Sequence, residues 1–169
     1  AALNEDTGFT TLRREENRLV REFSIINPEA EADLLVSVCK LKTHSMTTLS
    51  GGVKNLFGCI PGLQKPELHL RFPDKSDFGE MLVDLALTDA VVGMEGDGPS
   101  GGSPRKLGFL AACRDPFLLD LCLAQIIGVS PASVPTIVAA QKRGLCPESA
   151  ELQFELFTRK TGVLNGIRQ

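Results

Sequence analysis

A short apolar run occupies residues 33–39 and reads Asp33-Leu34-Leu35-Val36-Ser37-Val38-Cys39. A nearly continuous series of Val and Leu over so few residues is typical of a parallel strand buried on both faces. Residues 89–94 and 107–113 have a similar strand-like character, and helical patterns occur between and after these segments. This alternation predicts an α/β fold for residues 1–169, a single domain with a mixed, largely parallel sheet flanked by helices.

The helices are predicted from apolar spacing and from residues that mark helix ends. They cover residues 78–87, 116–127 with Asp115 as the cap, and 133–143. Ser50 is expected to cap a further short helix that stops at Gly58, whereas the prolines between 59 and 77 predict a loop. Residues 9–26 suit either an amphipathic helix or two β-prone arms, and propensity does not decide between them.

Composition bounds the class of protein. The chain has 43% hydrophobic and 23% charged residues and a net charge of −3, which is typical of an ordinary globular domain and argues against nucleic-acid binding. No apolar run approaches the roughly 20 residues that cross a bilayer. Five cysteines without a CxxC pair predict no metal or cluster site built from local thiolates and a reducing, cytoplasmic location.

Basic residues follow directly on the first apolar run. Lys40, Lys42 and His44 alternate, so an extended backbone places all three on one face. Ligands collect outside the carboxyl ends of parallel strands, and clustered ammonium groups favour an anion such as a phosphate, a carboxylate or an enolate-like intermediate. The alternative is a solvated basic turn.

A glycine pair comes next and precedes a predicted helix. Gly51 and Gly52 would expose backbone N–H groups at the positive end of that helix, with Lys54 and Asn55 in its first turns. The spacing is not that of a P-loop. Together with Lys40 and Lys42, these residues form the predicted substrate-binding set, although an ordinary glycine turn explains them as well.

A second glycine-rich segment, residues 93–102, carries two carboxylates. Glu95 and Asp97 stand two residues apart where a predicted strand ends. They suit either acid/base work or binding of a hard cation, and with His44 they are the predicted catalytic residues. A flexible surface loop is the alternative.

Three motifs resemble a known family. The blocks Lys40-Leu41-Lys42-Thr43-His44 and Lys54-Asn55-Leu56-Phe57-Gly58, followed by Met94-Glu95-Gly96-Asp97-Gly98-Pro99, resemble domain-of-unknown-function family 362 over about residues 20–130. The resemblance favours a β-hairpin for residues 9–26. It also implies a 4Fe-4S cluster in a separate cysteine-rich module, so that this segment itself would hold no cofactor.

Two functions remain open at this level. The first is an enzyme domain that binds an anionic substrate for redox or acid/base chemistry. The second is a non-catalytic module that docks to an electron-transfer partner such as a ferredoxin-like module. The chain ends also suggest a segment of a longer protein, which would self-associate through apolar residues such as Leu152, Phe154, Leu156 and Phe157.

Overall fold

The computed structural model describes residues 8–33, 35, 37–39, 41–88, 111, 113–150, 155–160 and 163–168. Its elements in chain order are β1 (Phe9–Arg13), β2 (Glu22–Ile26), α1 (Asn27–Ala30), β3 (Lys42–His44), β4 (Thr48–Ser50), α2 (Gly52–Asn55), the 3-10 helix η1 (Leu56–Cys59), α3 (Gln64–Arg71), α4 (Lys75–Thr88), α5 (Pro116–Ile126), the 3-10 helix η2 (Pro131–Ser133), α6 (Pro135–Lys142), β5 (Glu155–Lys160) and β6 (Val163–Arg168).

The prediction of a largely parallel sheet is wrong. The described strands form three separate antiparallel pairs, β1 with β2, β3 with β4 and β5 with β6. Within 33–39, only Ser37 of the described residues lies in a β-bridge, and Val38 is 48% exposed. Residues 89–94 lie outside the described residues, as does 107–113 apart from Ala111 and Cys113. A short apolar run has no period of its own, so its composition also fits an irregular segment packed beside helices.

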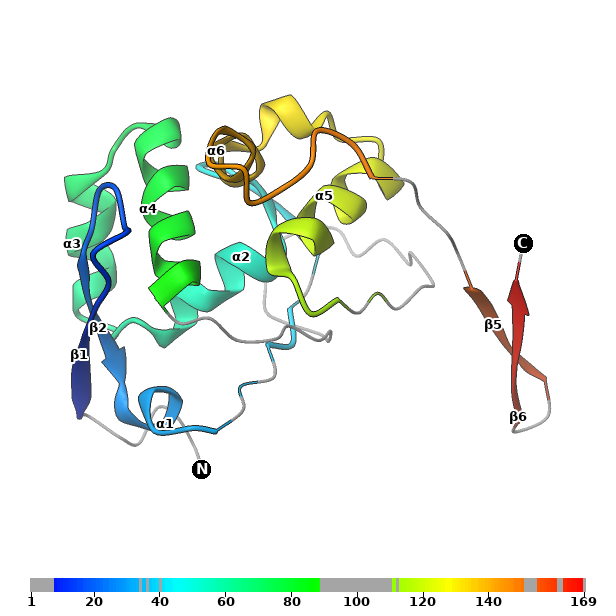
Figure 1. Ribbon diagram of the computed structural model, residues 1–169, viewed down its shortest axis with the longest axis horizontal. Helices are drawn as coiled ribbons and strands as arrows, with labels where there is room; N and C mark the ends of the chain where they lie inside the picture. Colours follow the sequence, from blue (N-terminus) through cyan, green and yellow to red (C-terminus); the bar gives the residue numbers. More distant parts are fainter. Residues whose placement is uncertain are drawn as a thin grey trace.

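Helices build most of the core instead. Helix α4 packs against α6 and α2, and α5 packs against the same two helices from another side (Figure 1). Phe78, Met81, Leu82 and Leu85 of α4 have no exposed surface. A Cβ at Gly79 would stand 2.6 Å from the Cβ of Pro135, so the absence of a side chain at Gly79 lets α6 approach α4 closely. The predicted helix over 78–87 is confirmed, and α4 extends it to Lys75–Thr88.

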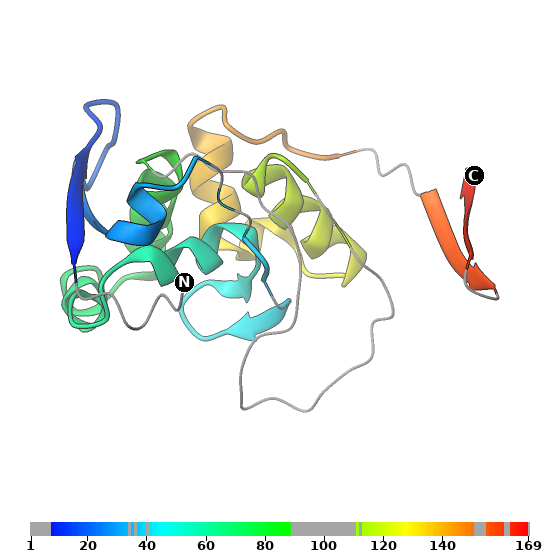
Figure 2. The same cartoon turned by 90° about the horizontal axis from the view of Figure 1, so that it is seen from below.

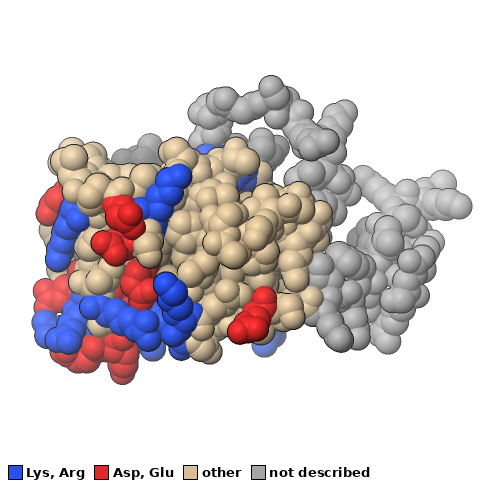
Figure 3. All heavy atoms as spheres, turned by 90° about the horizontal axis from the view of Figure 1, so that it is seen from above, with Lys and Arg blue, Asp and Glu red and all other residues tan. Residues whose placement is uncertain are grey.

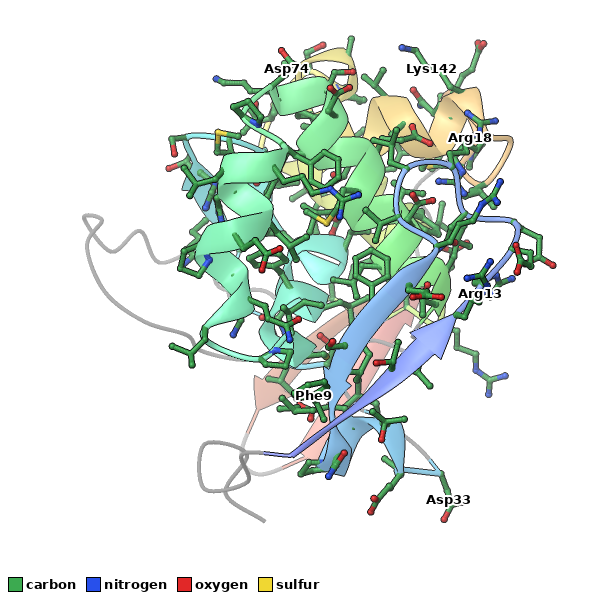
Figure 4. The ribbon with its side chains drawn as sticks, turned by 90° about the vertical axis from the view of Figure 1, so that its left-hand side faces the viewer. Phe9, Arg13, Arg18, Asp33, Asp74 and Lys142 are labelled. Atoms are coloured by element: carbon green, nitrogen blue, oxygen red, sulfur yellow. The ribbon has the colours of Figure 1, made fainter. Side chains whose placement is uncertain are left out.

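The β-hairpin over residues 9–26 is confirmed, with Phe9 opposite Ile26 and Arg13 opposite Glu22. Its turn is joined to α4 by Asp84, whose carboxylate accepts hydrogen bonds from the backbone N–H groups of Arg18, Leu19 and Val20. Figure 4 shows Arg13 and Arg18 toward the turn, whereas Phe9 lies at the open end of the hairpin.

One helix begins where the sequence predicts, and another helix lies where the sequence predicts a loop. The Asp115 carboxylate caps α5 by accepting from the N–H groups of Phe117 and Leu118, as predicted. Residues 59–77, in contrast, are not a loop, because α3 covers Gln64–Arg71. Pro66 lies in the first turn of α3, where a missing N–H breaks no helical hydrogen bond, so this proline is compatible with the helix.

The last hairpin, β5 and β6, extends away from the helices in Figure 1. Glu155 pairs with Arg168 at its open end and Lys160 with Val163 at its turn. Self-association through the apolar side chains of this region stays a prediction.

Candidate functional site

A pocket of about 290 Å³ lies where β3, β4, α2 and the start of α3 meet. Three lysines line it, Lys42 from β3, Lys54 from α2 and Lys65 from α3. Figure 2 shows the β3–β4 hairpin beside α2, and the strands pair Lys42 directly with Ser50. Directly opposed residues of an antiparallel pair point to the same face, which is why both line the pocket. We call this site the basic pocket.

Lys54 is half-buried in the basic pocket, and its Nζ stands 4.7 Å from the ring centroid of Phe57. Burial, together with the positive charges of Lys42 and Lys65, lowers the pKa of Lys54 to about 8. The Nζ of Lys65 donates to the carbonyl of Gly58 over 3.2 Å. None of these lysines forms an ion pair with a carboxylate of the described residues. The pocket therefore combines three positive charges without a described counter-charge.

The wall of the basic pocket also contains a buried polar atom without a hydrogen-bond partner among the described residues. Ser50 lines the pocket and is 7% exposed, and its Oγ is buried without a hydrogen-bond partner among the described residues. The sequence predicted Ser50 as a helix cap, but Gly51 occupies the N-cap position of α2 and no side chain of its own caps the helix. A buried hydroxyl without a partner costs about 1–3 kcal/mol, so a ligand that meets it gains a favourable contact.

Two hydrogen bonds to the carboxyl group of Asp120 explain why glycines stand at positions 51 and 52. The carboxyl of Asp120 accepts from the N–H of Gly52 over 2.6 Å and from the N–H of Val53 over 3.3 Å. A Cβ at Gly51 would stand 2.1 Å from Asp120 Oδ1. The positive end of α2 is thus occupied by a side chain of the protein, and the N–H groups of Gly52 and Val53 are already used.

Asp120 lies on α5 and is 1% exposed, so its carboxyl group is buried. Burial raises the pKa of Asp120 to about 7, although the two backbone hydrogen bonds oppose the rise. The signal was present in the chain: a single charge interrupts the apolar run Phe117-Leu118-Leu119-Asp120-Leu121. A buried carboxyl of this kind needs donors, and the N-terminus of a helix supplies them.

His44 lies at the other end of β3, where its Nδ1 accepts from the N–H groups of Met46 and Thr47 over 3.1 and 3.4 Å. Burial and the nearby charges of Lys54, His69 and Lys42 lower the pKa of His44. Through these two hydrogen bonds, Nδ1 of His44 holds the turn between β3 and β4. The left-handed φ of 61° at Thr48 belongs to the same tight turn.

The remaining predicted residues fall into two groups. Asn55 lines the basic pocket and donates from Nδ2 to Ser37 Oγ over 2.7 Å, which ties the 35–39 segment to α2. Lys40, Glu95 and Asp97 lie outside the described residues, so the predicted meeting of the basic cluster with the two carboxylates stays a prediction.

The cysteines do not form a ligand set. Within the part of the chain that the structure describes, no three His, Cys, Asp or Glu side chains come together as a metal site. The described residues therefore do not fit a cluster, and a 4Fe-4S cluster in a separate module stays a prediction. Of the helices described, none has the length and apolar character to span a bilayer, and the cytoplasmic location stays a prediction.

Known proteins similar to this chain support the family resemblance. A thylakoid-associated protein of Synechocystis sp. is 43% identical over 135 residues, which cover 75% of this chain and 42% of that protein. This chain thus spans about two fifths of the length of that curated relative. No solved structure matches the chain. The family model described as "Domain of unknown function (DUF362)" matches residues 2–125, which is well over half of the sequence, and the chain therefore belongs to this family.

Proposed function

We propose that the basic pocket binds a small anionic ligand, a phosphate or a carboxylate, through Lys42, Lys54 and Lys65. The observation that carries this proposal is the meeting of three lysines from three different elements at one pocket, with no carboxylate of the described residues paired to them. Like charges repel, so such an arrangement is costly unless an anion compensates it.

The half-buried position of Lys54 strengthens the argument. An exposed lysine turns its ammonium group into water, whereas Lys54 keeps its Nζ above the ring of Phe57 and close to two other cations. An anion at this place would form charge-assisted hydrogen bonds, which are about twice as strong as neutral ones. The hydroxyl of Ser50 adds a neutral donor in the same wall.

The glycine pair contributes to this function by position. Because Asp120 occupies the N-terminus of α2, the anion site is formed by side chains beside the helix and not by its terminal N–H groups. Gly51 and Gly52 allow Asp120 and the first residues of α5 to approach α2, and this packing fixes the place of Lys54. The proposal covers binding, and Glu95 and Asp97 would add catalysis to it.

The test is a calorimetric titration of the full chain with inorganic phosphate and with acetate. Lys54→Met should weaken binding of the anion at least tenfold, because a hydrogen bond to a charged group contributes about 1.5–3 kcal/mol. Ser50→Ala should weaken it less. Lys142→Met, at an exposed position on α6, is the matched control and should leave binding unchanged.

Two outcomes would contradict the proposal. One is equal weakening by Lys54→Met and Lys142→Met, which would indicate attraction to general positive charge. The other is the absence of anion binding combined with capture of an acidic ferredoxin-like protein that depends on the exposed Lys42. That second result would favour the docking alternative.

A further inference from the structure

A second and larger cavity opens next to the basic pocket. Its volume is about 830 Å³, within the range of small-molecule sites, and the two cavities share Val38, Asn55, Gly58 and Lys65 as lining residues. Its wall is mainly apolar and comes from several elements. It includes Phe9 of β1, Ile26 of β2, Leu56 of η1 and Leu63 at the start of α3.

Two of these apolar residues are poorly covered by the protein. Phe9 is 52% exposed and Leu63 is 96% exposed, although both stand at the cavity. Figure 4 shows Phe9 at the open end of the β1–β2 hairpin, away from the charged turn. Exposed apolar side chains around a cavity of this size are typical of a pocket that binds an apolar ligand group.

Charge is divided between the two cavities. The basic pocket carries Lys42 and Lys54, and Lys65 stands at the shared wall. Among the described residues that line the larger cavity, Lys65 at the shared wall is the only cation. A ligand that fills both cavities must therefore hold its negative charge at one end.

We propose that the site takes an acidic amphiphile, a single molecule whose phosphate or carboxylate head enters the basic pocket and whose apolar chain lies in the larger cavity. This inference rests on the anion binding proposed above and adds the class of ligand. The two cavities adjoin along the residues that line both, and one of these, Gly58, is exposed and has no side chain that would stand between them.

The experiment compares three probes by calorimetry on the full chain: inorganic phosphate, n-octyl phosphate below its micelle concentration, and 1-octanol. n-Octyl phosphate should bind at least tenfold more tightly than phosphate, because burying two methylene groups already accounts for such a factor at about 0.8 kcal/mol each. 1-Octanol should bind more weakly than n-octyl phosphate, since it leaves the lysines without an anion.

Matched variants separate the two halves of the site. Phe9→Ser with Leu63→Ser should remove the advantage of n-octyl phosphate over phosphate and leave phosphate binding intact. Leu19→Ser with Leu70→Ser changes two other exposed apolar residues, which do not line the cavity, and the advantage should persist. Leu63→Ser alone, tested if the double variant fails to fold, should reduce the advantage severalfold.

The outcomes distinguish this inference from the proposal on which it rests. Equal affinity for n-octyl phosphate and phosphate would overturn the amphiphile and leave anion binding in place. Binding of n-octyl phosphate that Lys54→Met does not weaken would overturn anion binding itself, and this inference with it. Binding to anionic lipid vesicles without binding of the monomeric probe would also overturn it, because a cavity of this kind takes one molecule at a time.

Discussion

Two regions of the molecule treat charge in opposite ways. Around the turn of the first hairpin, Asp84 is fully buried and accepts from three backbone N–H groups and from Arg143. In the basic pocket, Lys54 is half-buried beside two further lysines and without a described carboxylate. The first arrangement satisfies its charges within the fold, whereas the second leaves them for something outside it.

The exterior of the hairpin end follows the first arrangement. Figure 3 shows basic and acidic side chains side by side at that end of the molecule. Arg13 pairs with Glu15 and Glu22, and Arg143 pairs with Glu80 as well as with Asp84. This contrast between paired charges at the hairpin and unpaired lysines in the basic pocket supports the proposal that the pocket binds an anion.

The largest expected effect comes from breaking the balanced region. Asp84→Ala would leave Arg143 with only Glu80 and would strip three N–H groups of their acceptor. Removing one partner of a buried ion pair costs about 3–5 kcal/mol. We expect a loss of that size in the free energy of unfolding, measured with urea at pH 7.

Asp77→Ala, at an exposed position on the same helix, is the control and should change stability little. If Asp84→Ala does not fold, Asp84→Asn provides the measurement, since it keeps the size of the side chain. A loss for Asp84 no larger than the loss for Asp77 would show that the hairpin does not depend on this carboxylate.

The next effect concerns the cap that lies behind the basic pocket. Gly51→Ala would place a methyl group 2.1 Å from Asp120 Oδ1, and overpacking of this kind costs about 1–3 kcal/mol. The same substitution should cost much less when Asp120 is already alanine, which a double-mutant cycle by urea unfolding can measure. Gly62→Ala is the control, because no atom lies within 4 Å of its Cβ. Additive losses would contradict the contact.

These two carboxylates also show what the sequence can and cannot predict. Local signals worked where the chemistry was local: Asp115 and Pro116 mark the start of α5. Gly128 and Gly144, which have a left-handed φ, follow closely on the ends of α5 and α6. The carboxylates of Asp84 and Asp120 accept from backbone N–H groups more than 60 positions away in the chain. No local pattern could supply those partners, although a lone charge in an apolar helix indicates that one must exist.

The residues of the basic pocket that are close together in the sequence could be predicted, whereas the distant one could not. Lys42, Gly51, Lys54 and Asn55 do gather at one pocket, because the turn and the short helix that carry them are close in sequence. Lys65 was missed, since it lies on α3, in a region whose prolines suggested a loop. The prediction of a parallel sheet failed because a short apolar run does not show whether it pairs as a strand or packs against helices.

The third effect tests the unbalanced region through its pH dependence. If anion binding requires a charged Lys54, a pKa of about 8 predicts that the Kd for sulfate rises about tenfold between pH 7 and pH 9. Sulfate keeps its own charge over that range. Lys54→Arg stays charged and should remove most of the pH dependence. An equally steep rise in this variant would assign the titration to the other lysines that line the pocket, Lys42 or Lys65.

The smallest effect is on stability, and it has the opposite sign to the first. Without an anion, Lys54→Met should raise the free energy of unfolding by up to about 1 kcal/mol at pH 7, because it removes a half-buried charge that two lysines repel. The folded protein binds fewer protons than the unfolded chain between pH 8 and about 10.5, the usual pKa of lysine, so the stability of the wild type rises with pH in that window. The advantage of Lys54→Met should therefore shrink toward pH 10.

Added sulfate should stabilise the wild type more than the variant at pH 7, since a ligand that binds only the folded state adds stability by mass action. A variant that is less stable than the wild type under all these conditions would mean that Lys54 serves the fold, as Asp84 does, and that the two regions do not differ in the way inferred from their charges.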